Sequence, residues 1–143
     1  MFAIRDIDHL VLRVVDLDAM LGFYCGVLGC RVERRQDALG LVQLRAGRSL
    51  IDLVPITGPL GRRGGGPPVP DGRNMDHFCL RIEPWDEAAI TAHLARHGIA
   101  PGETGTRYGA EGDGPSIYIA DPEGNTVELK GPPAGPSVPP DDG

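Results

Sequence analysis

Long apolar segments, a surplus of basic residues and paired cysteines are all missing from this 143-residue sequence. No apolar run approaches the roughly 20 residues needed to cross a bilayer, so the sequence predicts no membrane segment. The net charge of −6 argues against nucleic acid as a partner. The three cysteines are odd in number and show no Cys-x-x-Cys spacing. They indicate reduced thiols in a cytoplasmic protein.

What the sequence does contain is a globular balance of 41% apolar and 24% charged residues, with glycine and proline concentrated in two places. The first cluster covers residues 57–74, shows no hydrophobic period and predicts a linker. The second covers residues 131–143 and predicts a disordered tail. These clusters separate a first module, residues 1–56, from a second module, residues 75–130.

The two modules share one pattern. Residues 8–14 read DHLVLRV and residues 76–82 read DHFCLRI, with Asp, His, Leu and Arg at the same offsets. Their alternation predicts a strand that carries its histidine on one face. A helical period follows each strand, and three short strands follow each helix. The predicted helices are 17–28 and 85–97, and the predicted strands are 31–37, 40–46, 49–54, 99–108, 116–120 and 126–130. The order is βαβββ twice, which predicts an α+β fold with one curved, eight-stranded mixed sheet around a concavity.

An acidic residue occupies the same place in both final strands, Asp52 in LIDL and Glu128 in TVEL. Alternation turns each acid away from its apolar neighbours and towards the face of the histidine. Imidazoles and carboxylates gathered at one point can bind a divalent metal, so His9, His77, Glu128 and Asp52 are candidate ligands. Each has an ordinary explanation as a hydrogen-bonded histidine or a solvated acid, but their repetition favours a metal. Asp52 is one methylene shorter than Glu, so the sequence leaves open whether its carboxylate reaches the metal.

The same alternation places further polar side chains on the concave face, namely Arg13, Gln43, Arg45, Arg81, Ser116 and Tyr118. Inward-facing cations suit an anionic substrate such as a carboxylate or a phosphate. We therefore predict that Arg13, Arg81, Ser116 and Tyr118 bind the substrate. The arginines also lie near strand ends, where they would reach solvent, and the sequence favours neither reading. The glycine-rich residues 109–114 are expected to form a lid.

Three segments, IDHLVLRV, GFYCGVLG and SIYIADPEGNTVEL, resemble the vicinal-oxygen-chelate superfamily, which includes glyoxalase I, bleomycin-resistance proteins and extradiol dioxygenases. The resemblance covers about residues 4–131, and the DPEGN turn before a Glu-bearing strand is its most specific part. It implies one divalent metal held by His9, His77 and Glu128, and a small-molecule substrate that chelates the metal through adjacent oxygens. Nickel, zinc, cobalt, manganese and iron are not distinguished. Glyoxalase I enzymes add an acidic ligand where this chain has Asp52.

The resemblance leaves several functions open. The preferred one is a glyoxalase-like lyase or isomerase in which Glu128 or Asp52 is the catalytic base. An extradiol-type dioxygenase would use two histidines and one glutamate as ligands. A thiol or epoxide transferase would share those three ligands, whereas a drug-binding resistance protein generally lacks them. Many relatives pair, so we expect a homodimer, with the site either within one chain or across the interface.

Overall fold

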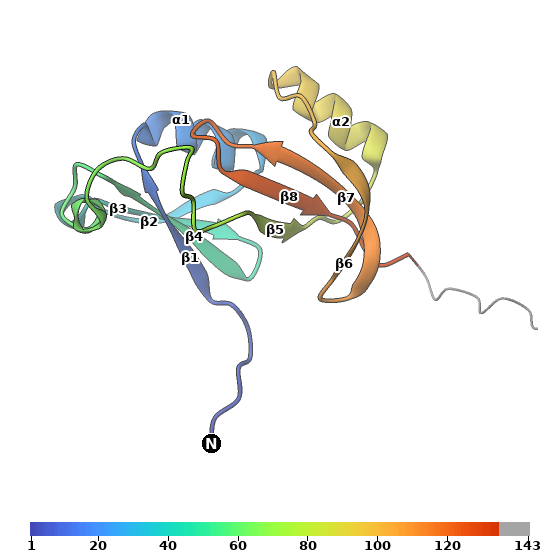
Figure 1. The fold of residues 1–143 in the computed structure, drawn as a ribbon, viewed down its shortest axis with the longest axis horizontal. Coiled ribbons are helices and arrows are strands. Elements are labelled where there is room, and N and C mark those ends of the chain that lie inside the picture. Colours follow the sequence, from blue (N-terminus) through green and yellow to red (C-terminus); the bar gives the residue numbers. More distant parts are fainter. Residues whose placement is uncertain (135–143) are drawn as a thin grey trace, which may run out of the picture. The chain divides into compact units, whose positions relative to one another are not determined.

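The computed structural model describes residues 1–134 of the chain. The chain divides into two compact units, Met1–Asn74 and Met75–Gly143, each of which is described by itself (Figure 1). The residues predicted to be a tail lie outside the described part from residue 135 onward. Residues 131–134 follow the last strand and lie beside residues 113–115, because the amides of Gly131 and Ala134 donate to the carbonyls of Pro115 and Asp113 at 2.8 and 2.9 Å.

The first unit is one βαβββ module followed by a loop. Its elements are β1 (His9–Val14), α1 (Leu17–Leu21), the π-helical turn η1 (Gly22–Val27), β2 (Arg31–Gln36), the 3-10 turn η2 (Asp37–Leu39), β3 (Leu41–Ala46), β4 (Ser49–Pro55) and the 3-10 turn η3 (Gly61–Gly64). The sheet order is β1-β4-β3-β2. Strand β1 pairs with β4 in parallel, and the other pairs are antiparallel.

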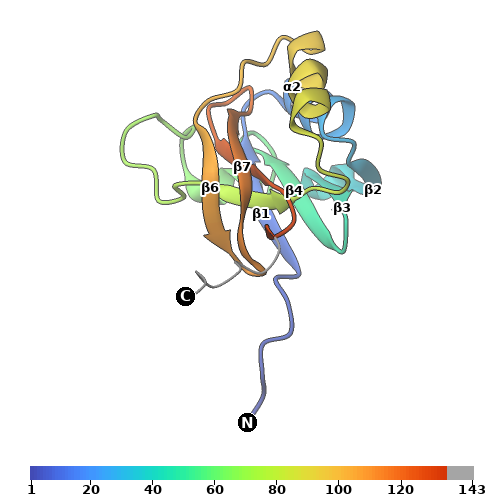
Figure 2. The same ribbon diagram turned by 90° about the vertical axis from the view of Figure 1, so that its right-hand side faces the viewer.

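The second unit repeats this arrangement. Its elements are β5 (Phe78–Arg81), α2 (Glu87–Arg96), β6 (Thr104–Gly109), β7 (Gly112–Ala120) and β8 (Thr126–Lys130). The sheet order is β5-β8-β7-β6, with β5 and β8 parallel. Helix α2 lies to one side of this sheet in both views (Figures 1 and 2). In each unit the carboxyl-terminal strand is therefore inserted next to the first strand.

The α+β class and the double βαβββ order are confirmed. The eight strands are divided between two four-stranded sheets rather than joined in one, because each first strand pairs with the last strand of its own module. Some boundaries also differ from the prediction. Strand β5 begins at Phe78, so His77 precedes it, and residues 99–103 lie before β6.

Both helices begin at an aspartate that accepts a hydrogen bond from the backbone amide three residues on. Asp16 accepts from Ala19, and Asp86 from Ala89, both at 3.0 Å. Such N-caps satisfy an amide that has no partner within the helix. The single helix predicted over residues 17–28 is divided into α1 and η1. It stops at Gly29, whose φ of 79° suits a residue without Cβ.

Burial follows the predicted alternation. The buried apolar residues of the strands in the first unit are Leu12, Val14, Val42, Leu44, Ile51, Leu53 and Val54. Those in the second unit are Ile117, Ile119, Val127 and Leu129. His9 and Val11, on the other face of β1, are exposed. Among the helices of residues 1–134, none combines the length and apolar character required to traverse a bilayer.

The DPEGN turn between β7 and β8 is organised by one buried carboxylate. Asp121, only 4% exposed, accepts hydrogen bonds from the backbone amides of Glu123 and Asn125, both at 2.9 Å. It also accepts from Nδ2 of Asn125 at 2.7 Å. Gly124 supplies the positive φ of 79° that the turn requires. The turn therefore sets where β8 starts, and with it the register of the Glu128 strand.

We expect Asp121→Ala to lower the free energy of unfolding by about 1–3 kcal/mol, because buried amides lose their acceptor. Urea denaturation measures this change. Asp113→Ala, which removes an exposed carboxylate from β7, is the matched control and should change stability little. Equal stability of the two variants would contradict the role assigned to Asp121.

Candidate metal and substrate site

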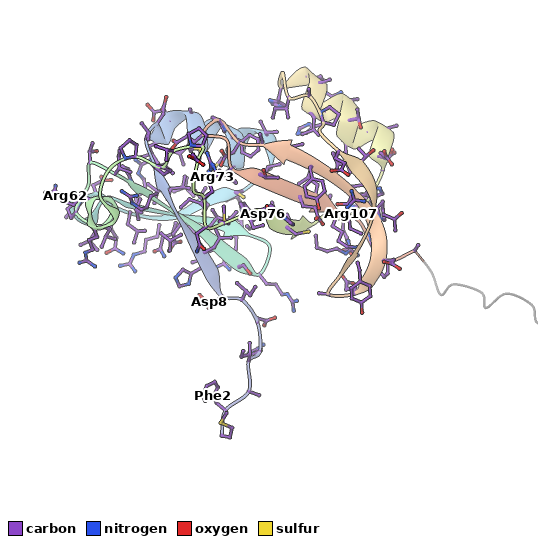
Figure 3. All side chains as sticks on the ribbon, in the orientation of Figure 1. Phe2, Asp8, Arg62, Arg73, Asp76 and Arg107 are labelled. Atoms are coloured by element: carbon purple, nitrogen blue, oxygen red, sulfur yellow. The ribbon has the colours of Figure 1, made fainter. Side chains whose placement is uncertain are left out.

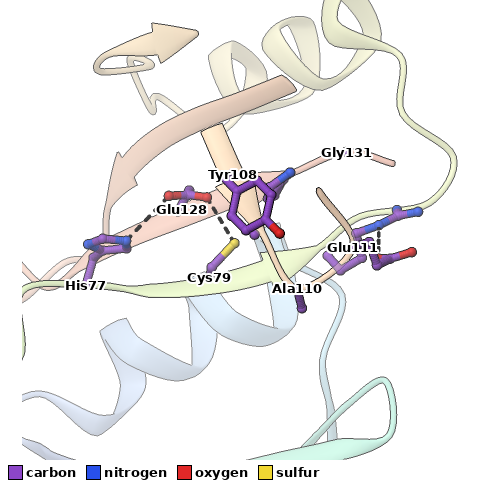
Figure 4. A pocket seen from close by; sticks show the side chains of 10 residues that line it. His77, Cys79, Tyr108, Ala110, Glu111, Glu128 and Gly131 are labelled. Carbon is purple, nitrogen blue, oxygen red and sulfur yellow. Dashed lines mark hydrogen bonds and ion pairs between the residues drawn. The ribbon is translucent and has the colours of Figure 1, made fainter. Parts of the chain in front are cut away.

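Glu128 is the centre of the polar face of the second unit. It lies on β8 between Cys79 of β5 and Tyr118 of β7, and it is 5% exposed. The Cys79 thiol donates to Oε2 at 3.1 Å, and Nε2 of His77 lies 3.4 Å from Oε1 (Figure 4). The Tyr118 hydroxyl is also hydrogen-bonded to the carboxylate. One glutamate is thus contacted by side chains of β7, of β5 and of the residue that precedes β5.

These contacts keep Glu128 ionised. Burial disfavours its charged form, but hydrogen bonds from Tyr118 and Cys79, the nearby Ser116 hydroxyl and the charge of His77 outweigh that effect. The net result is a pKa of Glu128 below its usual value. The opposite effect is seen at the donors. Burial and the bond to Glu128 raise the pKa of the Cys79 thiol to about 12, so this thiol is a donor and not a thiolate.

His77 is oriented by the residue before it. Its Nδ1 lies 2.6 Å from Oδ2 of Asp76, which leaves Nε2 directed at Glu128 (Figure 3 labels Asp76). A carboxylate at one ring nitrogen is the usual support for a histidine that binds a metal through the other. Two donors bonded to the same metal at 2.0–2.2 Å are about 2.8–3.1 Å apart at neighbouring octahedral positions and about 3.3–3.6 Å apart in tetrahedral geometry. The observed 3.4 Å between Nε2 and Oε1 fits the tetrahedral separation.

The first unit has the corresponding pair, His9 and Asp52, but fewer hydrogen bonds support its carboxylate. His9 Nδ1 lies 2.7 Å from Oδ1 of Asp8, as in the second unit. This bond, and to a lesser extent the charge of Asp52, raise the pKa of His9. Asp52 is 4% exposed and lies between Val11 and Gln43. Gln43 is the only neighbour that donates to it within residues 1–134, through two long contacts of 3.3 and 3.4 Å.

Each unit thus offers a histidine and a carboxylate on one face. Within the described residues, no group of three or more His, Cys, Asp or Glu side chains is arranged to hold a metal ion. The binding of a metal by His9, Asp52, His77 and Glu128 together therefore stays a prediction. What the structure adds is the Asp-His pairing in both repeats, which the shared DH dipeptide of residues 8–9 and 76–77 encodes.

A cavity of about 270 Å³ lies over this face of the second unit. It is lined by His77, Cys79, Arg81, Tyr108, Gly109, Ala110, Glu111, Glu128, Lys130 and Gly131. The residues expected to form a lid belong to the β6–β7 hairpin, which turns at Ala110 and Glu111. This hairpin is held beside the cavity by the pairing of β6 with β7. The pairing runs from Thr104 opposite Ile117 to Gly109 opposite Gly112.

The predicted substrate-binding arginines are engaged by the protein itself. Arg13 donates through Nε to the carbonyl of Gly61 at 2.9 Å, and through Nη2 to Gly65 and Gly66. It therefore organises the predicted linker. Arg81 lines the cavity, but its guanidinium forms ion pairs with Glu111 at 2.8 Å and Glu83 at 3.1 Å.

The two predicted polar residues of β7 differ. Tyr118 is bonded to Glu128, and its ring meets that of His77 edge-on with centroids 5.3 Å apart. Ser116 is buried beside them, but its Oγ has no partner within hydrogen-bond geometry in the described residues. Sequence reasoning missed Asp76 and Lys130 as neighbours of the site. Strand parity places Cys79 on the face of His77, which indicates that it could line the pocket, and it does line the cavity. The same parity could have indicated Lys130, which shares the face of Glu128.

Comparison with known proteins identifies the family and supports the fold. The sequence model of the Glyoxalase/Bleomycin resistance protein/Dioxygenase superfamily matches residues 6–129. The chain belongs to this superfamily. An integron cassette protein of V. cholerae superposes with a TM-score of 0.72 at 26% identity, covering 92% of this chain and 98% of that one. A lactoylglutathione lyase of Agrobacterium tumefaciens gives 0.62 at 26% identity, with 88% and 92% covered.

Two curated relatives are similar in sequence. A catechol-2,3-dioxygenase of Bacillus subtilis is 28% identical over 126 residues, which are 86% of this chain and 40% of that enzyme. A glyoxalase domain-containing protein of Mycosarcoma maydis is 30% identical over 132 residues, 89% of this chain and 68% of that protein. The chain thus spans less than half of the dioxygenase and about two thirds of the fungal protein.

We expect Tyr118→Phe to raise the pKa of Glu128 in metal-free protein, because the charged carboxylate loses a hydrogen-bond donor. The wild-type carboxylate stays ionised at lower pH than an ordinary glutamate, and the variant should protonate at higher pH than the wild type. Carboxyl ¹³C NMR over a pH titration measures both. Tyr108→Phe alters an exposed tyrosine of the same cavity and should leave the pKa unchanged. Identical titrations of wild type and Tyr118→Phe would refute the assignment.

Proposed function

We propose that this protein is a metal-dependent, glyoxalase-like lyase or isomerase. Its substrate is a small molecule whose two adjacent oxygens chelate the metal. The observation that carries the proposal is the histidine–carboxylate pair in both units, each histidine held at Nδ1 by the aspartate before it. Membership of a superfamily that includes glyoxalase and dioxygenase enzymes supports the class of reaction.

His9, His77, Glu128 and Asp52 would hold the metal, as members of this superfamily commonly bind a divalent ion. Mixed imidazole and carboxylate donors suit nickel, zinc, cobalt, manganese or iron. When bound, such an ion acts as a Lewis acid that stabilises negative charge developing on substrate oxygens. The protein's own contribution is orientation, because Asp8 and Asp76 fix the two imidazole rings.

The proton transfer between adjacent carbons of the substrate falls to Asp52 or Glu128. Glu128 accepts hydrogen bonds from Cys79 and Tyr118, and its lowered pKa makes it a weaker base. Asp52 receives only the long contacts of Gln43 among the described residues, so more of its acceptor capacity remains. We therefore favour Asp52 as the base and Glu128 as the ligand.

The decisive experiment is metal analysis of the purified protein, followed by assays with methylglyoxal–thiol adducts and with catechols. Conversion of an adduct by protein loaded with nickel, cobalt or zinc supports the lyase or isomerase. Absence of any bound or activating divalent metal would overturn the proposal.

We expect His9→Ala and His77→Ala each to abolish stoichiometric metal binding, since each removes one donor of the set. Asp76→Asn, which leaves the donor but loosens its orientation, should weaken binding by about 10–100-fold. Isothermal titration with zinc measures all three. His97→Ala, on the exposed carboxyl-terminal end of α2, is the control and should bind as the wild type does. Full occupancy in either His→Ala variant would remove that residue from the site.

A second candidate is an extradiol-type dioxygenase. The catechol-2,3-dioxygenase relative favours it, as does the two-histidine, one-glutamate set that non-haem iron uses. A thiol or epoxide transferase would use the same three ligands. A resistance protein that only binds a drug would need none of them. Oxygen-dependent ring cleavage of catechol by the iron-loaded protein would establish the dioxygenase.

Asp52 separates these candidates. If it is a base or a fourth ligand, Asp52→Asn should lower turnover by about 100-fold or more, because an amide accepts protons poorly. Asp52→Glu restores the side chain usual in glyoxalase I and should retain activity and tighten metal binding. Turnover of the adduct and zinc affinity are the measurements. If neither variant differs from the wild type, Asp52 lies outside the site and the dioxygenase or transferase is preferred.

We further propose that the protein works as a homodimer in the cytoplasm. Cys25, Cys30 and Cys79 are free thiols, which suits a reducing compartment. A metal set divided between two units can be completed within one chain or by two copies. Sedimentation of the metal-loaded protein distinguishes a monomer from a dimer.

A further inference from the structure

One buried cation in the cavity has no role in the proposed metal chemistry. Lys130 is the single lysine among the 14 lysine and arginine residues of the chain. It lies on β8 two residues after Glu128, so its side chain shares the face of that carboxylate. The residue is 6% exposed and lines the cavity. A lysine this buried is uncommon and normally has an ionic partner.

Two glycines of the β6–β7 hairpin make the space for this side chain. A Cβ on Gly109 would lie 2.7 Å from the Cε of Lys130. A Cβ on Gly114 would lie 2.8 Å from its Nζ. The ammonium reaches the hairpin end and donates to the carbonyl of Gly112 at 3.1 Å. The lysine is therefore enclosed by backbone that has no side chains to block its approach to the cavity.

The charge of Lys130 is not neutralised by an ion pair. No ion pair within residues 1–134 involves it, although Arg81 in the same cavity has Glu111 and Glu83. An ammonium has three donor hydrogens, and Gly112 accounts for one. Two donors and one positive charge are thus available, and burying an ammonium without an anionic partner is unfavourable.

We propose that Lys130 binds a carboxylate group of the substrate, beside the metal-chelating oxygens. Two remaining N–H donors and a single charge match the two oxygens and single charge of a carboxylate. This assignment rests on the proposed function, in which the other end of the substrate chelates the metal. It narrows the substrate class to small acids. Lys130 is a specificity residue, because a carboxylate held here fixes which substrate atoms lie beside the metal ligand Glu128.

The single lysine allows a direct test. Protein labelled with ¹³C-lysine gives one side-chain Cε signal, which reports on Lys130 without any substitution. Titration of the metal-free and the zinc-loaded protein with acetate should shift this signal saturably. Inorganic phosphate should bind less tightly than acetate, because its second negative charge is repelled by the carboxylates of Glu111 and Glu128 in the same cavity. No saturable shift with acetate, or tighter binding of phosphate, would overturn the proposal.

Variants test the same site by other means, with the amides of residues 109–112 as the signal. Lys130→Met and Lys130→Gln should each weaken acetate binding by about tenfold or more. Gly109→Ala keeps the charge but displaces the lysine side chain, so it should also weaken binding. Arg96→Met removes an exposed cation of α2 and should have no effect.

Zinc titration of the same variants separates this proposal from the proposed function. Unchanged zinc affinity with lost acetate binding in Lys130→Met supports an anion subsite distinct from the metal ligands. If the wild-type protein binds acetate but fails to bind zinc, the metal-dependent function is contradicted and the anion subsite is retained. Acetate affinity that is equal in wild type, Lys130→Met and Gly109→Ala would refute the subsite.

Discussion

The parallel pairing of the first and last strands of each module is the constraint on which the site depends. It sets Val11 opposite Asp52 in one unit and Cys79 opposite Glu128 in the other. Because side chains alternate between the two faces of a sheet, a shift of one residue would turn the acid towards the apolar face. The DPEGN turn, held together by the buried carboxylate of Asp121, fixes the start of β8 and so protects this register in the second unit.

The same register gives the two acids different surroundings. Glu128 has a thiol on one side and a phenol on the other, and both donate to it. Asp52 has Val11, which cannot donate, and Gln43 at long distances. A carboxylate that accepts several hydrogen bonds is stabilised in its charged form, whereas one with few keeps lone pairs for other partners. Duplication followed by divergence of these neighbours would let one acid serve as ligand and the other as base.

The cations illustrate how local contacts restrict the function of a long side chain. Arg13 is bound by loop carbonyls, Arg45 pairs with Glu33 at 2.6 Å, and Arg81 pairs with Glu111. Each of these guanidinium groups is engaged by a carbonyl or a carboxylate of the protein. Lys130 reaches the cavity through a hairpin that lacks side chains at Gly109 and Gly114. The charge that remains for a ligand is therefore set by packing rather than by the number of inward-facing cations.

The sequence by itself determined the repeat, the α+β class and the faces of the strands, because alternation and duplication are local patterns. It also gave His9, His77, Asp52 and Glu128 as candidate ligands from one shared offset. It could not predict that the strands form two sheets, since pairing partners are chosen by contacts distant in sequence. Strand parity could place Lys130 on the face of Glu128, but it could not show that Lys130 has no ionic partner among the described residues, because parity gives the direction of a side chain and not its contacts. Tertiary packing decides which polar group donates to a carbonyl, which pairs with a carboxylate and which lines the cavity without an ion pair.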